Sequence, residues 1–420
     1  MEKSHERVDQ IVDRLKQSFE QTPYFLQCQD YQEGETKDDV ILSVIIPARN
    51  EFPNIVHTIY SIWHCWEADG FDPNQIEIII VNNCSTDWQD PKYDFRKPGD
   101  RGTTEHLFPR GAFWARKVRV HYDPVAGNHS ARNKGAQLAR GKYLFFSDAH
   151  MAYRPSFFKH MIETIEQTGG MFHGAIAWMG AYPPSPHGVG CGYTIKLGEE
   201  IKGTWHTRRP SNDKFFYIPA LGHCSVGVLR KQFLEFGGYP EVHRSYGGGE
   251  FFINMLWWMM GSSVSVHPQA IGYHLSSGRG YSWNHDDYIS NVLGIAWALG
   301  MDEWRGRAYL NWLRRGRKEV MERLDKQTRK EYQSRRLRIE QERKYTFNEI
   351  ILQRPWSKLN EKTFGQPTDD LLIYEDTWLD LLKNSPKYVQ DEYNNPEWKQ
   401  KELAQFIEEN LRQFVYKPNH

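Results

Sequence analysis

Three short apolar runs, each followed by polar residues, dominate the first 150 positions of the chain. They span residues 40–46, 77–81 and 142–146. Short apolar runs that end in polar turns are typical of buried parallel strands. Between them, apolar residues recur at helical spacing over 54–69, and alanines favour a helix over 130–140. The alternation of strand and helix predicts an α/β domain with right-handed crossovers.

The remaining segments differ in character. Residues 88–113 are rich in charge, glycine and proline, which predicts a long loop or insertion. Prolines and glycines over 179–215 predict a mobile loop region above the working face of the domain. The pattern predicts a helix over 286–299, and the proline-free, highly charged stretch 303–344 predicts one long helix or two.

Composition excludes some classes of protein. The 420 residues are 39% hydrophobic and 14% aromatic, which argues against a disordered chain and allows two or three domains. The 53 Lys+Arg balance the 53 Asp+Glu, so the chain is not a uniformly basic nucleic-acid protein. The chain has five widely spaced cysteines and no C-x-x-C pair. This spacing predicts scattered core thiols in a reducing compartment.

No segment predicts membrane insertion. The N-terminus is charged and has no apolar core, so it does not read as a signal peptide. The most apolar window, residues 251–266, is too short and too polar to span a bilayer. We therefore expect a soluble, cytoplasmic protein.

Each of the three predicted strands ends in a polar cluster. The clusters are residues 47–51, 82–87 and 147–150. In open α/β sheets, ligands bind beyond the carboxyl ends of the strands. Any one cluster is equally well explained as a turn and a helix cap. Three in succession predict a site for a polar ligand.

Asp148 and His150 are the sharpest candidates in these clusters. On extended backbone, residues i and i+2 point to the same side, so the carboxylate and the imidazole could share one divalent cation. Mixed oxygen and nitrogen ligands suit manganese, or another borderline transition ion, better than magnesium. An Asp-x-His pair taken alone is common by chance and is more readily explained as a surface hydrogen bond.

Several motifs, in this order, carry a resemblance to a known family. The motifs are Ser43–Glu51, Ile79–Asp87, Gly127–Ala136, Ala139–His150, Gly222–Gly227, Phe236–Pro240, Tyr246–Glu250 and Ile271–His274. Over residues 40–280 the chain resembles the family-2 glycosyltransferases, and its Asp-x-His motif is similar to that of the polypeptide N-acetylgalactosaminyltransferases. The resemblance implies an α/β catalytic domain of the GT-A fold over 39–300, a Rossmann-like mixed sheet with helices on both faces. A helical lead-in over 1–38 and a mainly helical, locally basic extension over 301–420 would flank it.

The resemblance also implies roles for individual residues. Asp148, His150 and His274 would hold Mn²⁺ or another divalent cation on the diphosphate of a UDP-sugar; without the family, His274 reads as a core-edge histidine. Glu250 and Asp148 would be catalytic, with Glu250 near the donor sugar or the acceptor hydroxyl. The implied donor-binding residues are Pro47, Arg49, Glu51, Asn83, Asp87, Arg132, Ser147, Gly248 and Gly249.

Two departures from the family pattern leave questions open. Asn82 and Asn83 replace the usual pair of aspartates after the second strand, which puts the choice of donor in doubt. Glu250 is followed by Phe251, where inverting enzymes commonly have a second carboxylate that acts as general base. We therefore favour a retaining mechanism, with the leaving phosphate helping to deprotonate the acceptor. An inverting mechanism with Glu250 as the base stays open.

The acceptor is the least specified part of the reaction. Residues 305–344 hold 15 Lys+Arg against 6 Asp+Glu, a local excess of +9, so the neutral total hides a basic segment. Such a segment could follow phosphates, and the organisation looks similar to bacteriophage enzymes that glycosylate hydroxymethylated pyrimidines in DNA. The blander interpretation is a solvated helix with internal ion pairs. Candidate acceptor contacts are Trp257, Trp283, His285 and Asp286.

Other functions remain in competition. The acceptor could instead be a protein or a cell-surface polysaccharide, and the sugar a hexose or an N-acetylhexosamine. A non-catalytic module that binds a nucleotide or a glycan is a second class. A nucleotidyltransferase is a third, but the glycine-rich loop expected near the first strand is absent. Neither the sugar nor the oligomeric state follows from the residues.

Overall fold

A computed structural model describes most of the chain between residues 40 and 365. The described ranges are 40–51, 54–85, 118–123, 127–179, 189–197, 201–207, 209–243, 246–275, 284–302, 305 and 318–365. The predicted lead-in over 1–38 and the predicted insertion over 88–113 lie outside them.

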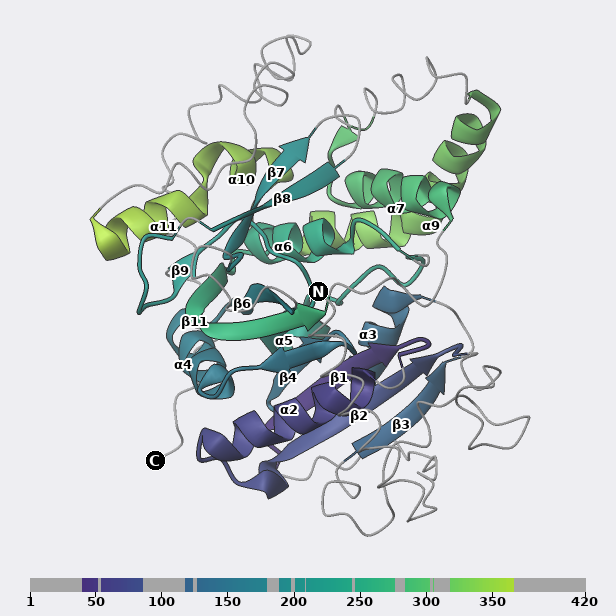
Figure 1. The fold of residues 1–420 in the computed structure, drawn as a ribbon. Helices are drawn as coiled ribbons and strands as arrows, with labels where there is room; N and C mark the ends of the chain where they lie inside the picture. Colours follow the sequence, from purple (N-terminus) through teal and green to yellow (C-terminus); the bar gives the residue numbers. More distant parts are fainter. Residues whose placement is uncertain are drawn as a thin grey trace, which may run out of the picture.

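The described strands form one large mixed sheet and one hairpin (Figure 1). The strands are β1 (Leu42–Ala48), β2 (Ile76–Asn83), β3 (Val118–Asp123), β4 (Tyr143–Ser147), β5 (Met151–Tyr153), β6 (Met171–Met179), β7 (Gly192–Leu197), β8 (Ile201–His206), β9 (Phe216–Tyr217), β10 (Ser225–Leu229) and β11 (Val264–Leu275). The order in the large sheet is β3-β2-β1-β4-β10-β6-β11-β5, with β9 paired to β11. The three strands predicted from apolar runs are confirmed as β1, β2 and β4.

Parallel and antiparallel pairs divide the sheet. β1 pairs in parallel with β2 and with β4, and β2 with β3. β10 runs antiparallel between β4 and β6, whereas β11 is parallel to β6. The carboxyl ends of β1, β2 and β4 therefore meet at one edge, which is where the sequence places its polar clusters.

Helices cover both faces of the sheet (Figure 1). The described helices are α2 (Asn54–Ala68), the 3₁₀ turn η1 (Pro73–Gln75), α3 (Asn128–Leu138), α4 (Phe157–Thr168), α5 (Arg230–Glu235), α6 (Gly249–Met259), α7 (His285–Ala298), α9 (Lys318–Glu342), α10 (Phe347–Gln353) and α11 (Pro355–Phe364). The predicted helices over 54–69, 130–140 and 286–299 are confirmed as α2, α3 and α7.

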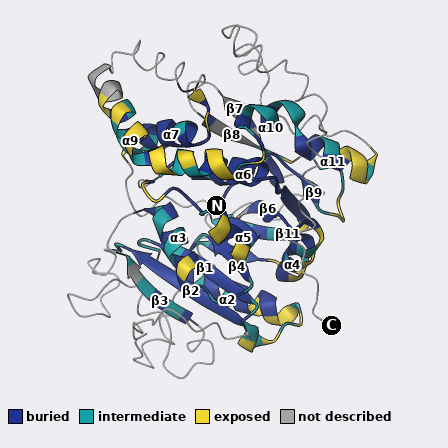
Figure 2. Ribbon diagram, turned by 180° about the vertical axis from the view of Figure 1, so that it is seen from behind, coloured by how far each residue is buried: buried dark blue, intermediate teal, exposed yellow. Residues whose placement is uncertain are grey.

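Two hydrophobic clusters form the core, one on each face. Leu42, Val44 and Ile46 of β1 point to the face covered by α2 and α4. Ile45 points to the opposite face, which α3 and α6 cover. Side chains alternate between the two faces of a strand, so β1 contributes to both hydrophobic clusters. Figure 2 shows that most of the large sheet is buried. A mixed sheet with helices on both faces and a helical C-terminal region confirms the predicted fold class.

The described part of 179–215 contains regular structure, so the prediction of a loop region is wrong there. β7 and β8 form an antiparallel hairpin in register from Gly192↔His206 to Leu197↔Ile201. Glycines made this stretch look like a loop. At Gly190, however, a β-carbon would lie 2.5 Å from the Trp205 ring, so the glycine allows an aromatic side chain to pack on the backbone.

The C-terminal helices pack on the sheet domain and share its core. Tyr332 of α9 and Trp356 of α11 are both buried in the larger cluster. Asn360 exchanges two hydrogen bonds with the backbone of Tyr217, at 2.8 and 2.7 Å. α9 also confirms the long helix predicted within 303–344.

Several arginines of α9 have partners within the protein. Arg335 donates to the carbonyls of Phe236 and Gly238 at 2.7 and 2.8 Å. Arg336 binds both carboxylate oxygens of Asp302 at 2.7 Å and lies 4.0 Å from the centre of the Trp297 ring. These arginines in the described part of the basic segment therefore attach α9 to its neighbours. Among the described helices, none is both long and apolar enough to cross a membrane.

Candidate metal centre and donor site

Two chain segments bring the candidate metal ligands to the edge of the sheet. Asp148 follows β4, where its N–H donates to the carbonyl of Cys224 at 3.2 Å. His150 precedes β5, and β5 pairs with β11 so that Met151 lies opposite His274. The N–H of Leu275 donates to the carbonyl of His150 at 3.0 Å and closes this corner.

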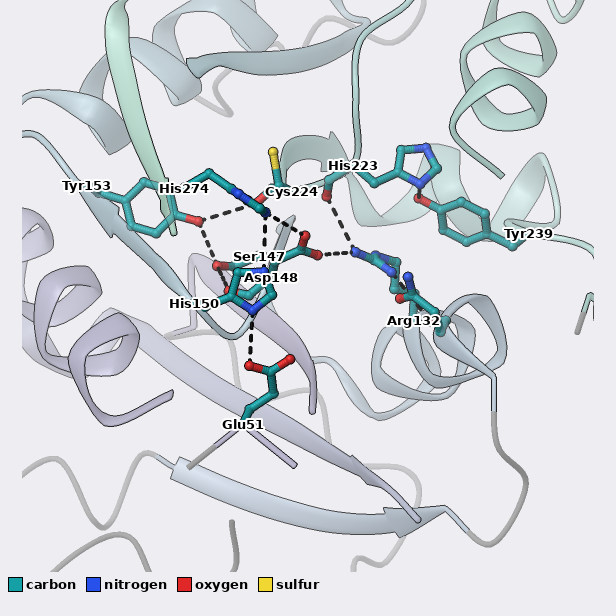
Figure 3. Close-up of polar contacts among 11 residues, drawn as sticks. Glu51, Arg132, Ser147, Asp148, His150, Tyr153, His223, Cys224, Tyr239 and His274 are labelled. Atoms are coloured by element: carbon teal, nitrogen blue, oxygen red, sulfur yellow. Dashed lines mark hydrogen bonds and ion pairs between the residues drawn. The ribbon is translucent and has the colours of Figure 1, made fainter. Parts of the chain in front are cut away.

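Asp148, His150 and His274 converge on one point, as predicted (Figure 3). One ligand atom from each residue lies within 4.8 Å of the others, and among the described residues this is the one group of three or more such side chains. The two Nε2 atoms are 3.2 Å apart, and Nε2 of His274 is 3.6 Å from Oδ2 of Asp148. All three side chains are partly exposed, so an ion could reach them.

Arg132 lies behind Asp148. Its guanidinium is fully buried and donates to Oδ1 of Asp148 at 2.7 Å, with a longer contact of 3.5 Å to the carbonyl of His223. Burial alone would raise the pKa of Asp148, but the hydrogen bond from His274 and the charge of Arg132 together hold it far below its usual value. The carboxylate stays ionised, with Oδ2 turned to the histidines. Arg132 has no exposed surface in this arrangement. Its predicted contact with the donor stays a prediction.

Glu51 adds a contact that the sequence did not predict. Its Oε2 lies 3.0 Å from Nδ1 of His150, although the two residues are 99 positions apart. A proton on Nδ1 is donated to this carboxylate, which leaves the lone pair of Nε2 for a cation. A carboxylate on the outer nitrogen is the usual support of a metal-binding histidine. The donor set and this support therefore fit a borderline divalent ion.

Ser147 is buried at the end of β4, and its hydroxyl contacts groups within the protein. Its hydroxyl lies 2.6 Å from the Tyr153 hydroxyl and donates to the carbonyl of Asp148 at 2.8 Å. The donor-binding role of Ser147 stays a prediction. Its contacts fix the backbone on which Asp148 stands.

The ends of β1 and β2 form the corner predicted to hold the nucleoside. The N–H of Asn50 donates to the Ser85 hydroxyl at 3.2 Å, and Asn50 has a left-handed backbone with φ 57°. Asn83 is buried, and its amide oxygen accepts from the N–H of Gly127 at 2.7 Å. Asn83 thus holds the start of α3. Pro47, within β1, and Arg49, just after it, are partly buried at this edge; Asp87 lies outside the described residues.

A glycine loop leads into α6 and to Glu250. Gly248 caps the helix with φ 75°, and a β-carbon there would lie 2.7 Å from Cδ1 of Ile295. Gly249 is buried, and its Cα faces the imidazole of His129. Glu250 stands in the first turn of α6, where the helix dipole favours a carboxylate.

The segment 221–224 connects the glycine loop to the metal ligands. Nδ2 of Asn254 donates to the carbonyls of Leu221 at 3.0 Å and of Glu250 at 2.7 Å. Burial raises the pKa of Cys224 well above its usual value, and the charges of Asp148 and Glu250 raise it further. Both carboxylates therefore lie near the same short segment.

The candidate acceptor contacts differ in burial and in whether the structure describes them. Trp257 is fully buried, and its Nε1 donates to Oε1 of Gln232 at 3.0 Å. Its predicted acceptor contact stays a prediction. His285 and Asp286 begin α7, where Asn284, not Asp286, caps the helix by accepting from the Asp286 N–H at 2.8 Å. Trp283 lies outside the described residues.

Comparisons with known proteins bear on this edge of the sheet. A sequence profile of the family described as Glycosyl transferase family 2 matches residues 110–180, a stretch that includes α3, β4 and the Asp148–His150 pair. No curated protein matches the chain at a significant level.

Two complexes are among the solved structures that match the chain. GalNAc-T7 with UDP, GalNAc and Mn²⁺ is 18% identical, with 63% of this chain and 48% of that chain covered and a TM-score of 0.49. The chain thus spans about half the length of GalNAc-T7. TarS 1–349 of S. aureus with UDP-GlcNAc is 13% identical, with 90% and 93% covered and a TM-score of 0.41.

Proposed function

We propose that this protein is a metal-dependent glycosyltransferase that moves a sugar from a UDP-sugar to an acceptor hydroxyl. The observation that carries the proposal is the convergence of Asp148, His150 and His274 at the carboxyl edge of the sheet, with Glu51 on the outer nitrogen of His150. The family-2 profile match over residues 110–180 supports the same chemistry.

The chain's own residues prepare this edge for a cation and a diphosphate. Oδ2 of Asp148, Nε2 of His150 and Nε2 of His274 would hold Mn²⁺ or a similar ion. Such an ion, when bound, supplies a Lewis acid that offsets phosphate charge as the nucleotide leaves. Arg132 fixes one oxygen of Asp148, and Glu51 fixes the ring of His150, so the ligands are oriented before the ion binds.

Glu250 is the residue we propose at the transferred sugar. Its place in the first turn of α6 stabilises a carboxylate that accepts hydrogen bonds from sugar hydroxyls. We favour retention of configuration, in which the C1–O bond to UDP breaks, the acceptor oxygen bonds to C1 on the same face, and the departing phosphate takes the acceptor proton. With Glu250 as general base, the acceptor oxygen would attack from the opposite face and inversion would result.

Manganese-dependent release of UDP tests the enzyme against a non-catalytic binder. Purified protein is incubated with UDP-glucose or UDP-N-acetylglucosamine, with Mn²⁺ or with EDTA. Asp148→Ala should abolish turnover, whereas Asp213→Ala, on an exposed loop, should leave it intact. Nucleotide binding without any turnover would favour the binder.

For the acceptor we propose hydroxymethylated pyrimidines in DNA, on the basis of the +9 charge of residues 305–344. That basis is weakened because Arg335 and Arg336 already bind groups within the protein. Labelled UDP-sugar is therefore offered with modified DNA, with a glycan and with protein in parallel. Label in the glycan or the protein but not in DNA would replace the DNA proposal.

A further inference from the structure

The hairpin of β7 and β8 carries an aromatic side chain toward the segment 221–224. Tyr193 of β7 is partly buried, and its ring packs edge-on against Trp205 of β8 at 4.7 Å between centroids. Its N–H donates to the carbonyl of Ala220 at 2.9 Å, which ties the hairpin to the chain just before Leu221.

Glycines on two sides set the position of the Tyr193 ring. A β-carbon on Gly203 would lie 2.5 Å from the ring, and one on Gly222 would lie 2.6 Å from the hydroxyl oxygen. The ring therefore lies against β8, with its hydroxyl on the backbone of Gly222. A side chain held this closely is preorganised, so little conformational entropy is lost when it binds a ligand.

The hydroxyl of Tyr193 makes no hydrogen bond to any residue within the described ranges. A hydroxyl can donate one hydrogen bond and accept two, and a partly buried one usually has a partner. Burial raises the pKa of Tyr193 well above its usual value, and the charge of Glu250 raises it further, so the group is a neutral hydroxyl at physiological pH.

Gly222 lies midway between the two ends of the proposed donor site. On one side, the carbonyl of Cys224 accepts from the N–H of Asp148 at 3.2 Å. On the other, Asn254 joins the carbonyl of Leu221 to that of Glu250. The Tyr193 hydroxyl, which packs on Gly222, therefore lies between the residues that would hold the diphosphate and the carboxylate that would meet the sugar.

We infer that the Tyr193 hydroxyl binds a hydroxyl or amide group of the transferred sugar and helps to select that sugar. The inference rests on the proposed function and adds to it a contact from the hairpin. A neutral hydroxyl suits a sugar better than a phosphate, for which charged donors are the usual partners. The hairpin would then act as a preformed wall of the sugar site.

The test is Tyr193→Phe, which removes one oxygen and keeps the ring against Trp205. Affinities for UDP and for UDP-N-acetylglucosamine, with Mn²⁺ present, are measured by titration calorimetry. We expect affinity for the UDP-sugar to fall about 3- to 10-fold and affinity for UDP to stay unchanged, since a neutral hydrogen bond contributes about that much. Tyr332→Phe, on α9 against Gly294 of α7, is the matched control and should change neither affinity.

The outcomes separate this inference from the proposed function. If wild type binds the UDP-sugar and Tyr193→Phe binds it equally well, the inference is wrong and the transferase proposal stands. Equal losses for UDP and UDP-sugar would assign Tyr193 to the nucleotide and overturn the sugar contact. A lower thermal midpoint in Tyr193→Phe would make the hydroxyl structural. If wild type neither binds nor turns over any UDP-sugar, the proposed function fails and the inference falls with it.

Discussion

Removing the carboxylate of Glu51 should weaken metal binding without unfolding the protein. The bond from Nδ1 of His150 to Oε2 of Glu51 is 3.0 Å long, and the two side chains are 23% and 16% exposed. Glu51→Ala deletes the acceptor, and loss of such a supporting carboxylate typically lowers metal affinity about 10- to 100-fold. Because both groups are partly exposed, solvent screening places the expected loss near the lower end.

Glu51→Gln should cause a smaller loss of metal affinity than Glu51→Ala. The amide keeps an oxygen acceptor but loses the charge, and a neutral hydrogen bond is roughly half as strong as a charge-assisted one. We therefore expect an intermediate loss of affinity, on the order of 3- to 5-fold. Free Mn²⁺ is followed by electron paramagnetic resonance during titration of each variant, because the aqueous ion gives a distinct signal that disappears on binding.

A matched control lies elsewhere in the chain. Glu163 faces Nδ1 of His160 at 3.9 Å on α4, so Glu163→Gln changes a similar carboxylate–histidine pair away from the metal ligands. It should bind Mn²⁺ as wild type does. Unchanged Mn²⁺ affinity in Glu51→Ala would refute the orienting role of Glu51, and a deficit in turnover that excess Mn²⁺ restores would support it.

Three further predictions concern chemistry, backbone and pH. Asp148→Ala should abolish Mn²⁺ binding and UDP release, measured by titration and by a coupled UDP assay. Gly248→Ala should cost about 1–2 kcal/mol in the free energy of unfolding, because φ is 75° and Ile295 fills the space; urea unfolding measures this. Burial lowers the pKa of His173 from 6.5 to about 4, despite its hydrogen bond with Asn254. As pH falls below 6.5 the unfolded chain takes up the proton first, so His173 alone should lower the free energy of unfolding by about 1.4 kcal/mol per pH unit between 6.5 and 4; His173→Gln should reduce the slope measured by urea unfolding by about that amount.

Local patterns were sufficient to predict the strands that position the site. β1, β2 and β4 are continuous apolar runs because both of their faces are buried, and a continuous run is visible without knowledge of the neighbouring strands. The antiparallel strand β10 lies between β4 and β6 through long-range pairing, which no local pattern specifies. The hairpin of β7 and β8 was missed because its glycines serve packing and look like loop signals.

The site residues also differ in whether a local sequence pattern predicts them. Asp148 and His150 form a short sequence motif. Glu51 is 99 positions from His150 in the sequence, and the two residues meet because the chain after β1 lies beside the residues before β5. Arg132 and Ser147 were assigned to the donor because their residue types suit it, but both are buried beside Asp148. The burial of Trp257 has a signal in the sequence, because residues 251–260 are apolar apart from Asn254, as in a largely buried helix.

We propose that the edge formed by Asp148, His150 and His274 activates a UDP-sugar through a divalent ion. The most direct measurement is UDP release from a panel of UDP-sugars by the wild-type protein, first with Mn²⁺, then after EDTA, then with Mn²⁺ restored. We expect UDP release with at least one donor, loss of release with EDTA and recovery of release with Mn²⁺. Release that EDTA does not affect, or binding of UDP-sugars with no release under any of these conditions, would contradict this proposal.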